Sequence, residues 1–205
     1  DGAFGLWAAA SATYRHLTAG LSLADSWSTD AHKTLNAPYD SGIVFCRDRA
    51  ALVRTMQASG SYLIYSDRRD NMLYTPEMSR RARGIELWAA LKSLGASGVG
   101  DLVDTLCDNA QYFARRLTAQ EFHVPNDVVF NQVLVSCDSA EETKQTLALI
   151  QSGGVCWCGG ALWQGEPVIR VSVCSWRTTK ADVDESVAAF VSARAQAKAT
   201  LSSQS

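Results

Sequence analysis

One stretch of sequence, residues 25–40, constrains the fold of this chain more than any other. It reads DSWSTDAHKTLNAPYD and surrounds a single lysine, Lys33, with polar and aromatic side chains. A strand-like apolar run, Ile43–Cys46, follows it. A lysine next to His32 and close to Asp30 is typical of an amine held in a polar pocket, which is the environment that a Schiff-base lysine requires. The residues alone leave a second interpretation open, a solvated lysine in a surface loop.

Composition limits the class of protein and its partners. The chain has 205 residues, of which 47% are hydrophobic and 20% are charged, so it can bury the core of one large or two small domains. A net charge of −2 argues against a nucleic-acid surface, which needs a basic excess. No apolar run reaches the ~20 residues of a membrane span. We therefore expect neither nucleic acid nor membrane as a partner. Because the chain opens at Asp1 without an initiating methionine, we expect it to be part of a longer protein.

The cysteines and histidines argue for a reducing compartment and against a metal centre. The six cysteines follow no disulfide pattern, and Cys156-Trp157-Cys158 has C-x-C spacing rather than the C-x-x-C spacing of zinc and redox sites. Most of them lie in apolar runs, where free cysteine behaves as a small hydrophobic residue. We therefore expect reduced core thiols in a cytoplasmic protein. The three histidines show no paired spacing, so we expect no metal site.

The apolar periodicity predicts an α/β chain, in which a strand-rich first part leads through two long helices into a small α+β unit. The segment 58–74 has no period and is predicted to be a loop of the length that lids have. The polar tail, 195–205, is expected to be frayed. The expected strands are 21–25, 43–46, 128–135, 155–163 and 168–173, and the expected helices are 48–57, 80–95, 99–117, 140–152 and one that begins at the N-cap signal 178–182.

The lysine stretch also carries a recognisable motif. It contains Asp25-Ser-x-x-x-Asp-x-His-Lys33, then Asn36-x-Pro-Tyr-Asp-x-Gly42, and the turn Asp1-x-Ala-x-Gly5 precedes both. This combination resembles the lysine motif of the group II pyridoxal-phosphate-dependent amino-acid decarboxylases, which include aromatic-amino-acid, glutamate and diaminobutyrate decarboxylases. The resemblance continues through residues 76–88, 131–133, 169–173 and 176–182, so it covers nearly the whole chain.

The resemblance implies a fold, a cofactor and an activity. The fold would be the α/β fold type I of pyridoxal-phosphate enzymes, similar to aspartate aminotransferase. Residues 1–85 would be the later part of the large cofactor-binding domain, and residues 86–205 the small C-terminal α+β domain. The activity would be the loss of carbon dioxide from an L-amino acid in a homodimer with shared active sites. The upstream part of the cofactor site would lie outside the chain, so the chain alone is expected to be inactive.

The resemblance also assigns roles to individual residues. Lys33 would bind pyridoxal 5'-phosphate covalently, and His32 would lie near its phosphate or its imine. Asp1 would lie beside the pyridine nitrogen and keep it protonated, while Ala3 would lie against the ring face. Ser79 would contact the phosphate of the partner subunit's site, near a helix start that suits an anion. Each of these residues also has a plain structural interpretation, such as a helix cap for Ser79.

The aperiodic segment and Asp30 leave choices open. The family's lid tyrosine protonates the α-carbon after carbon dioxide leaves, and Tyr62 matches its place better than Tyr65 does. Several family members carry asparagine where this chain has Asp30. A carboxylate facing a phosphate dianion would be repulsive, so Asp30 is expected to bond His32 or a backbone amide instead.

Four arginines remain to be explained. Arg80, Arg81 and Arg83 begin a predicted helix and are expected to pair with carboxylates at an interface or near the site. Arg170 lies in the middle of an apolar strand, so we expect it to be buried and paired. It would serve either the structure or a substrate carboxylate, and we favour the structural role.

Two other functions remain compatible with these residues. One is a different enzyme of the same fold, an aminotransferase or a lyase. The other is a non-catalytic paralogue that acts as an interaction partner. A degenerate copy would be expected to lose Lys33 or Asp1, and this chain keeps both.

Overall fold

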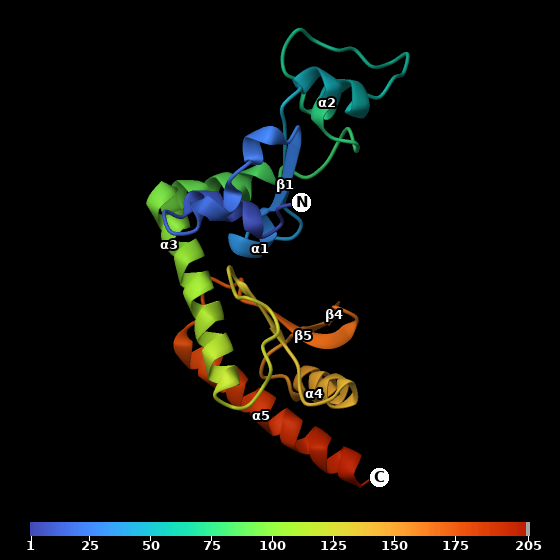
Figure 1. The fold of residues 1–205 in the computed structure, drawn as a ribbon. Helices are drawn as coiled ribbons and strands as arrows, with labels where there is room; N and C mark the ends of the chain where they lie inside the picture. Colours follow the sequence, from blue (N-terminus) through green and yellow to red (C-terminus); the bar gives the residue numbers. More distant parts are fainter. Residues whose placement is uncertain (204–205) are drawn as a thin grey trace.

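A computed structural model describes residues 1–203 as an elongated molecule in which one bent helix links two parts (Figure 1). The first part holds short helices and a two-stranded sheet, and the second holds a three-stranded sheet packed with helices. The order of elements confirms the α/β expectation. Within residues 1–203, no helix is both long and apolar enough to cross a membrane.

The lysine stretch forms a strand, a single helical turn and a second strand. Strand β1 (Ser26–Asp30) pairs with the antiparallel strand β2 (Gly42–Cys46), and α1 (Ala31–Thr34) lies between them. The prediction of a strand at 21–25 was wrong, because Leu21–Leu23 is a 3₁₀ helix, η3. Gly20 begins η3 in the left-handed region, at φ 88°, and this turn delays pairing until Ser26. The strand at 43–46 is confirmed.

The segment after β2 follows local signals in the sequence. Helix α2 (Arg49–Met56) begins where the Asp48 carboxylate accepts hydrogen bonds from the amides of Ala50 and Ala51. Beyond it, residues 57–83 contain no longer element than the short 3₁₀ helix η4 (Asn71–Tyr74). The predicted helix and the predicted loop are both confirmed.

The linking helix α3 (Gly84–Thr118) is two helical segments joined at a break. Gly95 has φ 65° and ψ −179°, a conformation that belongs to glycine, so the expected end of a helix there is confirmed. The helix expected from residue 80 begins only at Gly84. Its second segment buries the apolar side chains that face the C-terminal sheet, among them Leu106, Phe113 and Leu117.

The second part is an antiparallel sheet in the order β3-β5-β4, formed by Gln132–Val135, Glu166–Ser172 and Gly159–Trp163. Its core combines Val133 and Ile169 with Phe190 of helix α5 (Lys180–Ser202), and α4 (Ala140–Gly153) also packs on β5. The expected hairpin and helices are confirmed. Strands β3 and β4 are shorter than predicted. The Asn126 side chain bonds the backbone of β3, so the segment before residue 132 turns instead of extending.

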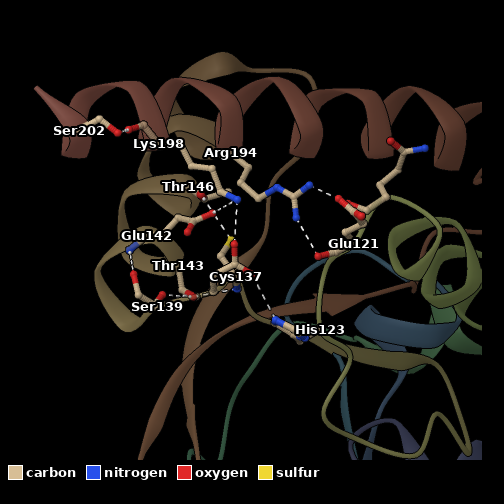
Figure 2. A network of polar contacts seen from close by, with 12 residues as sticks. Glu121, His123, Cys137, Ser139, Glu142, Thr143, Thr146, Arg194, Lys198 and Ser202 are labelled. Carbon is tan, nitrogen blue, oxygen red and sulfur yellow. Dashed lines mark hydrogen bonds and ion pairs between the residues drawn. The ribbon is translucent and has the colours of Figure 1, made fainter.

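The prediction of a frayed tail from residue 195 was wrong for the residues that the structure describes. Helix α5 continues to Ser202 because Ala197 is buried and Arg194 donates to the carbonyls of Gln120 and Glu121. Lys198 lies 2.8 Å from the Asp138 carboxylate and holds the same helix (Figure 2). The last two residues of the predicted tail, 204–205, lie outside the described residues.

Candidate active site

The first residues of the chain lie beside the end of β1, where α1 begins. The Gly2 amide donates to the Ser28 carbonyl at 2.8 Å, and the Asp30 amide donates to the Ala3 carbonyl at 3.4 Å. A Cβ on Gly2 would come within 2.8 Å of the Leu6 Cβ, so this approach requires glycine. The backbone thus brings the Asp1–Ala3 turn and the lysine turn to one place.

Lys33 is held but accessible. Its Nζ lies 2.8 Å from Asp30 Oδ2 and 5.0 Å from the centre of the Phe4 ring, and its side chain is 31% exposed. The ion pair keeps the amine in a defined place, and the cation–π contact adds to this. Lys33 thus lies in a helical turn and its amine has two specific neighbours, which favours the polar-pocket interpretation.

Asp30, which was expected to bond His32 or a backbone amide, is the counter-ion of this site. Its Oδ2 contacts Lys33 Nζ and lies 3.6 Å from His32 Nε2. Asp30 occupies the N-cap position of α1, but its side chain makes no capping bond. The carboxylate is thereby free to face the two basic side chains.

His32 is oriented by the backbone of Ser41. Its Nδ1 lies 3.1 Å from both the amide nitrogen and the carbonyl oxygen of Ser41, and its ring packs on Tyr39 with centroids 4.0 Å apart. When Nδ1 accepts the Ser41 amide proton, Nε2 carries the ring proton and points it toward Asp30. The imidazole is thus fixed next to the lysine.

Asn36 links the lysine turn to the C-terminal part, a role that sequence reasoning missed. Its Nδ2 donates to the carbonyls of Lys33 at 2.7 Å and Cys174 at 2.8 Å, and its Oδ1 accepts from the Trp176 amide at 2.9 Å. Its φ of 49° is a conformation that asparagine tolerates better than most residues. The asparagine directly after a helical turn was the available signal.

The arginine cluster reaches the site through Arg83. Arg83 Nε lies 2.5 Å from Asp40 Oδ1, and this hydrogen bond holds the pKa of Asp40 below its usual range. Arg80 pairs with Glu77, and Arg81 pairs with Glu86. The expected pairing with carboxylates is confirmed, and one pair anchors the end of the lysine stretch.

Arg170 is not where sequence reasoning put it. It is exposed, and it forms no ion pair among residues 1–203, so the prediction of a buried, paired arginine was wrong. The alternation of side chains along a β-strand explains why Arg170 is exposed. Ile169 and Val171 on either side of it face the core, so Arg170 points outward.

Among residues 1–203, Tyr62, Tyr65 and Ser79 form no hydrogen bond or ring contact with Lys33 or His32. Tyr62 is 78% exposed in the loop that follows α2, and this loop projects away from α1 (Figure 1). The Tyr65 hydroxyl donates to the Ala58 carbonyl, which ties it to its own loop. Ser79 is exposed in the turns before α3. Within one chain, the structure joins Lys33 and His32 but not these three residues.

A cavity of about 400 Å³ lies beside β1, and Asp1, Leu6, Trp27 and Phe130 are among its lining residues. Neither Lys33 nor His32 lines it. Asp1 is exposed, and its Oδ1 accepts from the Ala3 amide at 3.0 Å. We place the candidate site at the lysine, because the reactive amine lies there, whereas Asp1 is the one predicted site residue that lines this cavity.

The residues present suit a phosphorylated aldehyde such as pyridoxal phosphate. The amine of Lys33 is accessible for a carbonyl group, and the Asp1 carboxylate is an acceptor for a protonated ring nitrogen. Among residues 1–203, no group of three or more His, Cys, Asp or Glu side chains lies close enough together to hold a metal ion.

Comparisons with known proteins point to one family of enzymes. Residues 1–137 match the family model described as the pyridoxal-dependent decarboxylase conserved domain. Aspartate 1-decarboxylase of Aliivibrio fischeri is 32% identical over 121 residues, which are 59% of this chain and 22% of that protein. Histidine decarboxylase of Rattus norvegicus is 27% identical over 198 residues, which are 87% of this chain and 30% of that protein.

Solved structures show the same fold. Oryza sativa TDC with PLP and tryptamine matches 96% of this chain with a TM-score of 0.85 and 19% identity. Mouse CSAD matches 94% with a TM-score of 0.81 and 21% identity. The matched part is 44% of each of those chains. This chain therefore spans less than half the length of these proteins, and its fold is the fold type I of pyridoxal-phosphate enzymes.

Proposed function

We propose that this chain, which belongs to the pyridoxal-dependent decarboxylase family, supplies the lysine side of an active site that decarboxylates an L-amino acid. One observation carries the proposal. The amine of Lys33 is accessible and held 2.8 Å from Asp30, next to the turn that bears Asp1 and Ala3. The family's cofactor is pyridoxal 5'-phosphate, which withdraws electrons from the substrate's α-carbon when it is bound.

Each residue of this chain has a distinct task in the proposed site. The Lys33 amine is the covalent attachment point, and it has to be neutral in order to attack a carbonyl. A carboxylate at 2.8 Å stabilises the protonated amine, so the ion pair with Asp30 has to loosen first. His32, whose Nε2 proton faces that carboxylate at 3.6 Å, competes with the lysine amine for it. Asp1 would hold a proton on the ring nitrogen, and Ala3 would leave the ring face uncovered.

We also propose that the whole protein is a homodimer with shared active sites. Tyr62 would donate a proton to the α-carbon, and Ser79 would contact the phosphate, each in the partner's site. The exposure of both residues supports this. Tyr62 is a better donor than Tyr65, because the Tyr65 hydroxyl is committed to Ala58.

The proposal includes a domain division and a compartment. Residues 1–85 would belong to the large cofactor-binding domain, and residues 86–205 to the small domain. The compartment would be the cytoplasm, because the six cysteines are unpaired in the structure.

The test uses the full-length protein, pyridoxal phosphate and a panel of L-amino acids, with identification of the products. We expect an amine and carbon dioxide from one substrate class, and loss of both with Lys33→Ala. Lys92→Ala, which removes an exposed lysine of α3, is the matched control and should keep full activity. The 205 residues alone should form no product, because they span less than half of the related proteins.

The products separate the competing functions. A keto acid in place of an amine would favour an aminotransferase of the same fold. Amine formation that survives Lys33→Ala would refute the role of this lysine. A full-length protein that turns over no amino acid, and whose cellular role survives Lys33→Ala, would favour the non-catalytic paralogue.

A further inference from the structure

A second cavity lies in the C-terminal part, far along the chain from Lys33. Its volume is about 170 Å³, and it lies between the end of β5 and the first turns of α5. Two cysteines of one short segment, Cys156 and Cys158, both line it. Cys158 is 3% exposed, whereas Cys156 is partly exposed. The cavity thus presents two thiols to one small space, one reachable from outside and one shielded.

The surroundings of the two thiols make them chemically unequal. Cys156, Cys158 and Ser186 of α5 line the cavity together, and the Ser186 hydroxyl donates to the Asp182 carbonyl at 2.8 Å. The neighbouring Cys158 thiol lowers the pKa of Cys156 to about 7. The Cys156 thiol and burial raise the pKa of Cys158. Cys156, which is also the more exposed of the two, is therefore the nucleophile of the pair, and Cys158 keeps its proton.

Three other cysteines lack these features. Burial raises the pKa of Cys107 to about 12, and burial also raises the pKa of Cys137 and Cys174. None of them lines this cavity, and each lies far from a second cysteine in sequence. Of these five cysteines, only the two of the C-x-C segment line one cavity, although sequence reasoning had counted them with the inert core thiols.

The segment that carries the two thiols is irregular, and the Gln151 side chain donates to its Cys158 carbonyl at 2.8 Å. Residues 154–158 lie between α4 and β4, outside any helix or strand. The intervening side chain, Trp157, is 76% exposed, so it has no core position to lose. A disulfide needs the two Cβ atoms about 3.5–4.5 Å apart, and an unpaired loop can reach that geometry more readily than a strand can.

We propose that Cys156 and Cys158 form a modification site, a dithiol that peroxides oxidise reversibly to an intramolecular disulfide. The Cys156 sulfur attacks a peroxide oxygen and breaks the O–O bond, which gives a sulfenic acid and one molecule of water. The Cys158 sulfur then displaces the sulfenic oxygen, and its proton leaves with that oxygen as a second water. In total, two thiols and one hydrogen peroxide give one disulfide and two waters. A small thiol reductant reverses the change.

The experiment treats the reduced chain with hydrogen peroxide, alkylates the remaining thiols and maps the products by mass spectrometry. We expect the peptide that contains both cysteines to lose both alkylation sites, to weigh two hydrogens less and to recover with dithiothreitol. Cys158→Ser should stop the reaction at a sulfenic acid on Cys156, which dimedone traps. Cys156→Ser should leave Cys158 reduced. Cys174→Ser is the matched control and should leave the disulfide unchanged.

The wild-type map decides the proposal without any variant. Alkylation of both Cys156 and Cys158 after peroxide treatment would overturn it, as would a disulfide from either one to another cysteine. A second measurement is the alkylation rate at pH 7. A lowered pKa gives Cys156 a larger thiolate fraction at pH 7, but it also makes each thiolate less nucleophilic. Together, these effects should make alkylation of Cys156 roughly fivefold faster than that of an ordinary cysteine. A rate at Cys156 equal to that of Cys174 would contradict its role as nucleophile.

Discussion

Replacement of Asn36 should release the lysine turn from the C-terminal part. The carboxamide of Asn36 makes three hydrogen bonds with backbone groups, at 2.7 Å to Lys33, 2.8 Å to Cys174 and 2.9 Å from Trp176. Glycine and alanine at this position remove all three. Glycine also tolerates the φ of 49°, whereas alanine does not. The two variants thus separate the bonds from the backbone conformation.

The structure sets the size of both effects. Removal of three hydrogen bonds that contribute ~0.5–1.5 kcal/mol each would lower the free energy of unfolding by ~1.5–4.5 kcal/mol. We expect a loss of ~2 kcal/mol, because Asn36 is exposed and water replaces its partners. Alanine adds the left-handed strain of ~1–2 kcal/mol. It avoids the entropy cost of glycine, ~0.5–1 kcal/mol. Asn36→Ala should therefore be less stable than Asn36→Gly by about 1 kcal/mol.

Two assays read this out. Urea unfolding gives the loss of stability, and amide hydrogen exchange of Trp176 reports the bond to Asn36 directly. A local loss of ~2 kcal/mol should speed that exchange about thirtyfold. Asn126→Ala is the control, because Asn126 bonds the backbone of β3 instead. Unchanged exchange at Trp176 in Asn36→Gly, or an equal acceleration in Asn126→Ala, would refute the reasoning.

Three further predictions concern single contacts. Asp30→Asn should change the free energy of unfolding by less than ~1 kcal/mol, because both charges of the ion pair are partly exposed. The same variant should speed the acylation of Lys33 relative to that of Lys92. An acylation rate of Lys33 that is the same in the variant and the wild type would contradict the ion pair. The hydrogen bond from Lys198 lowers the pKa of Asp138 and raises that of Lys198, so their stabilisation should be present from about pH 4 to about pH 10 and fade outside that range. Asp138→Asn should then have a lower urea midpoint than the wild type at pH 6, and this gap should narrow as the pH falls below about 4; a gap that does not narrow would argue against this linkage. Gly95→Ala should lower the free energy of unfolding by ~1–3 kcal/mol. Backbone strain alone is the cause, because a Cβ at this position meets nothing within 4 Å. Gly84→Ala, where a Cβ also meets nothing, serves as the control, and an equal loss there would show that backbone strain is not the cause.

Elements with a local signal could be predicted from the sequence. Asp48 begins α2 with its own carboxylate, Gly95 interrupts α3, and Thr179 with Asp182 forms a capping box at the start of α5. The tail was misjudged because its helical state depends on distant partners, such as Asp138 for Lys198. Local polarity does not reveal those partners.

The candidate site likewise combines features that the sequence predicts with features that it does not. The motif predicted that Lys33 and His32 lie together, because they are neighbours in sequence. The contact of Asp30 with both side chains depends on the rotamers of a single turn, which spacing does not determine. The role of Asn36 was out of reach, because its partners lie 138 and 140 residues away.

The sequence separation between Asn36 and its two distant partners affects when these bonds can form during synthesis. A domain that folds during synthesis does so from its N-terminus, as residues leave the ribosome. The lysine turn emerges early, but the carbonyl of Cys174 and the amide of Trp176 that hold Asn36 emerge late. The lysine turn therefore gains its bonds to Cys174 and Trp176 only after those residues have emerged, and we expect any cofactor attached through Lys33 to be loaded after that point.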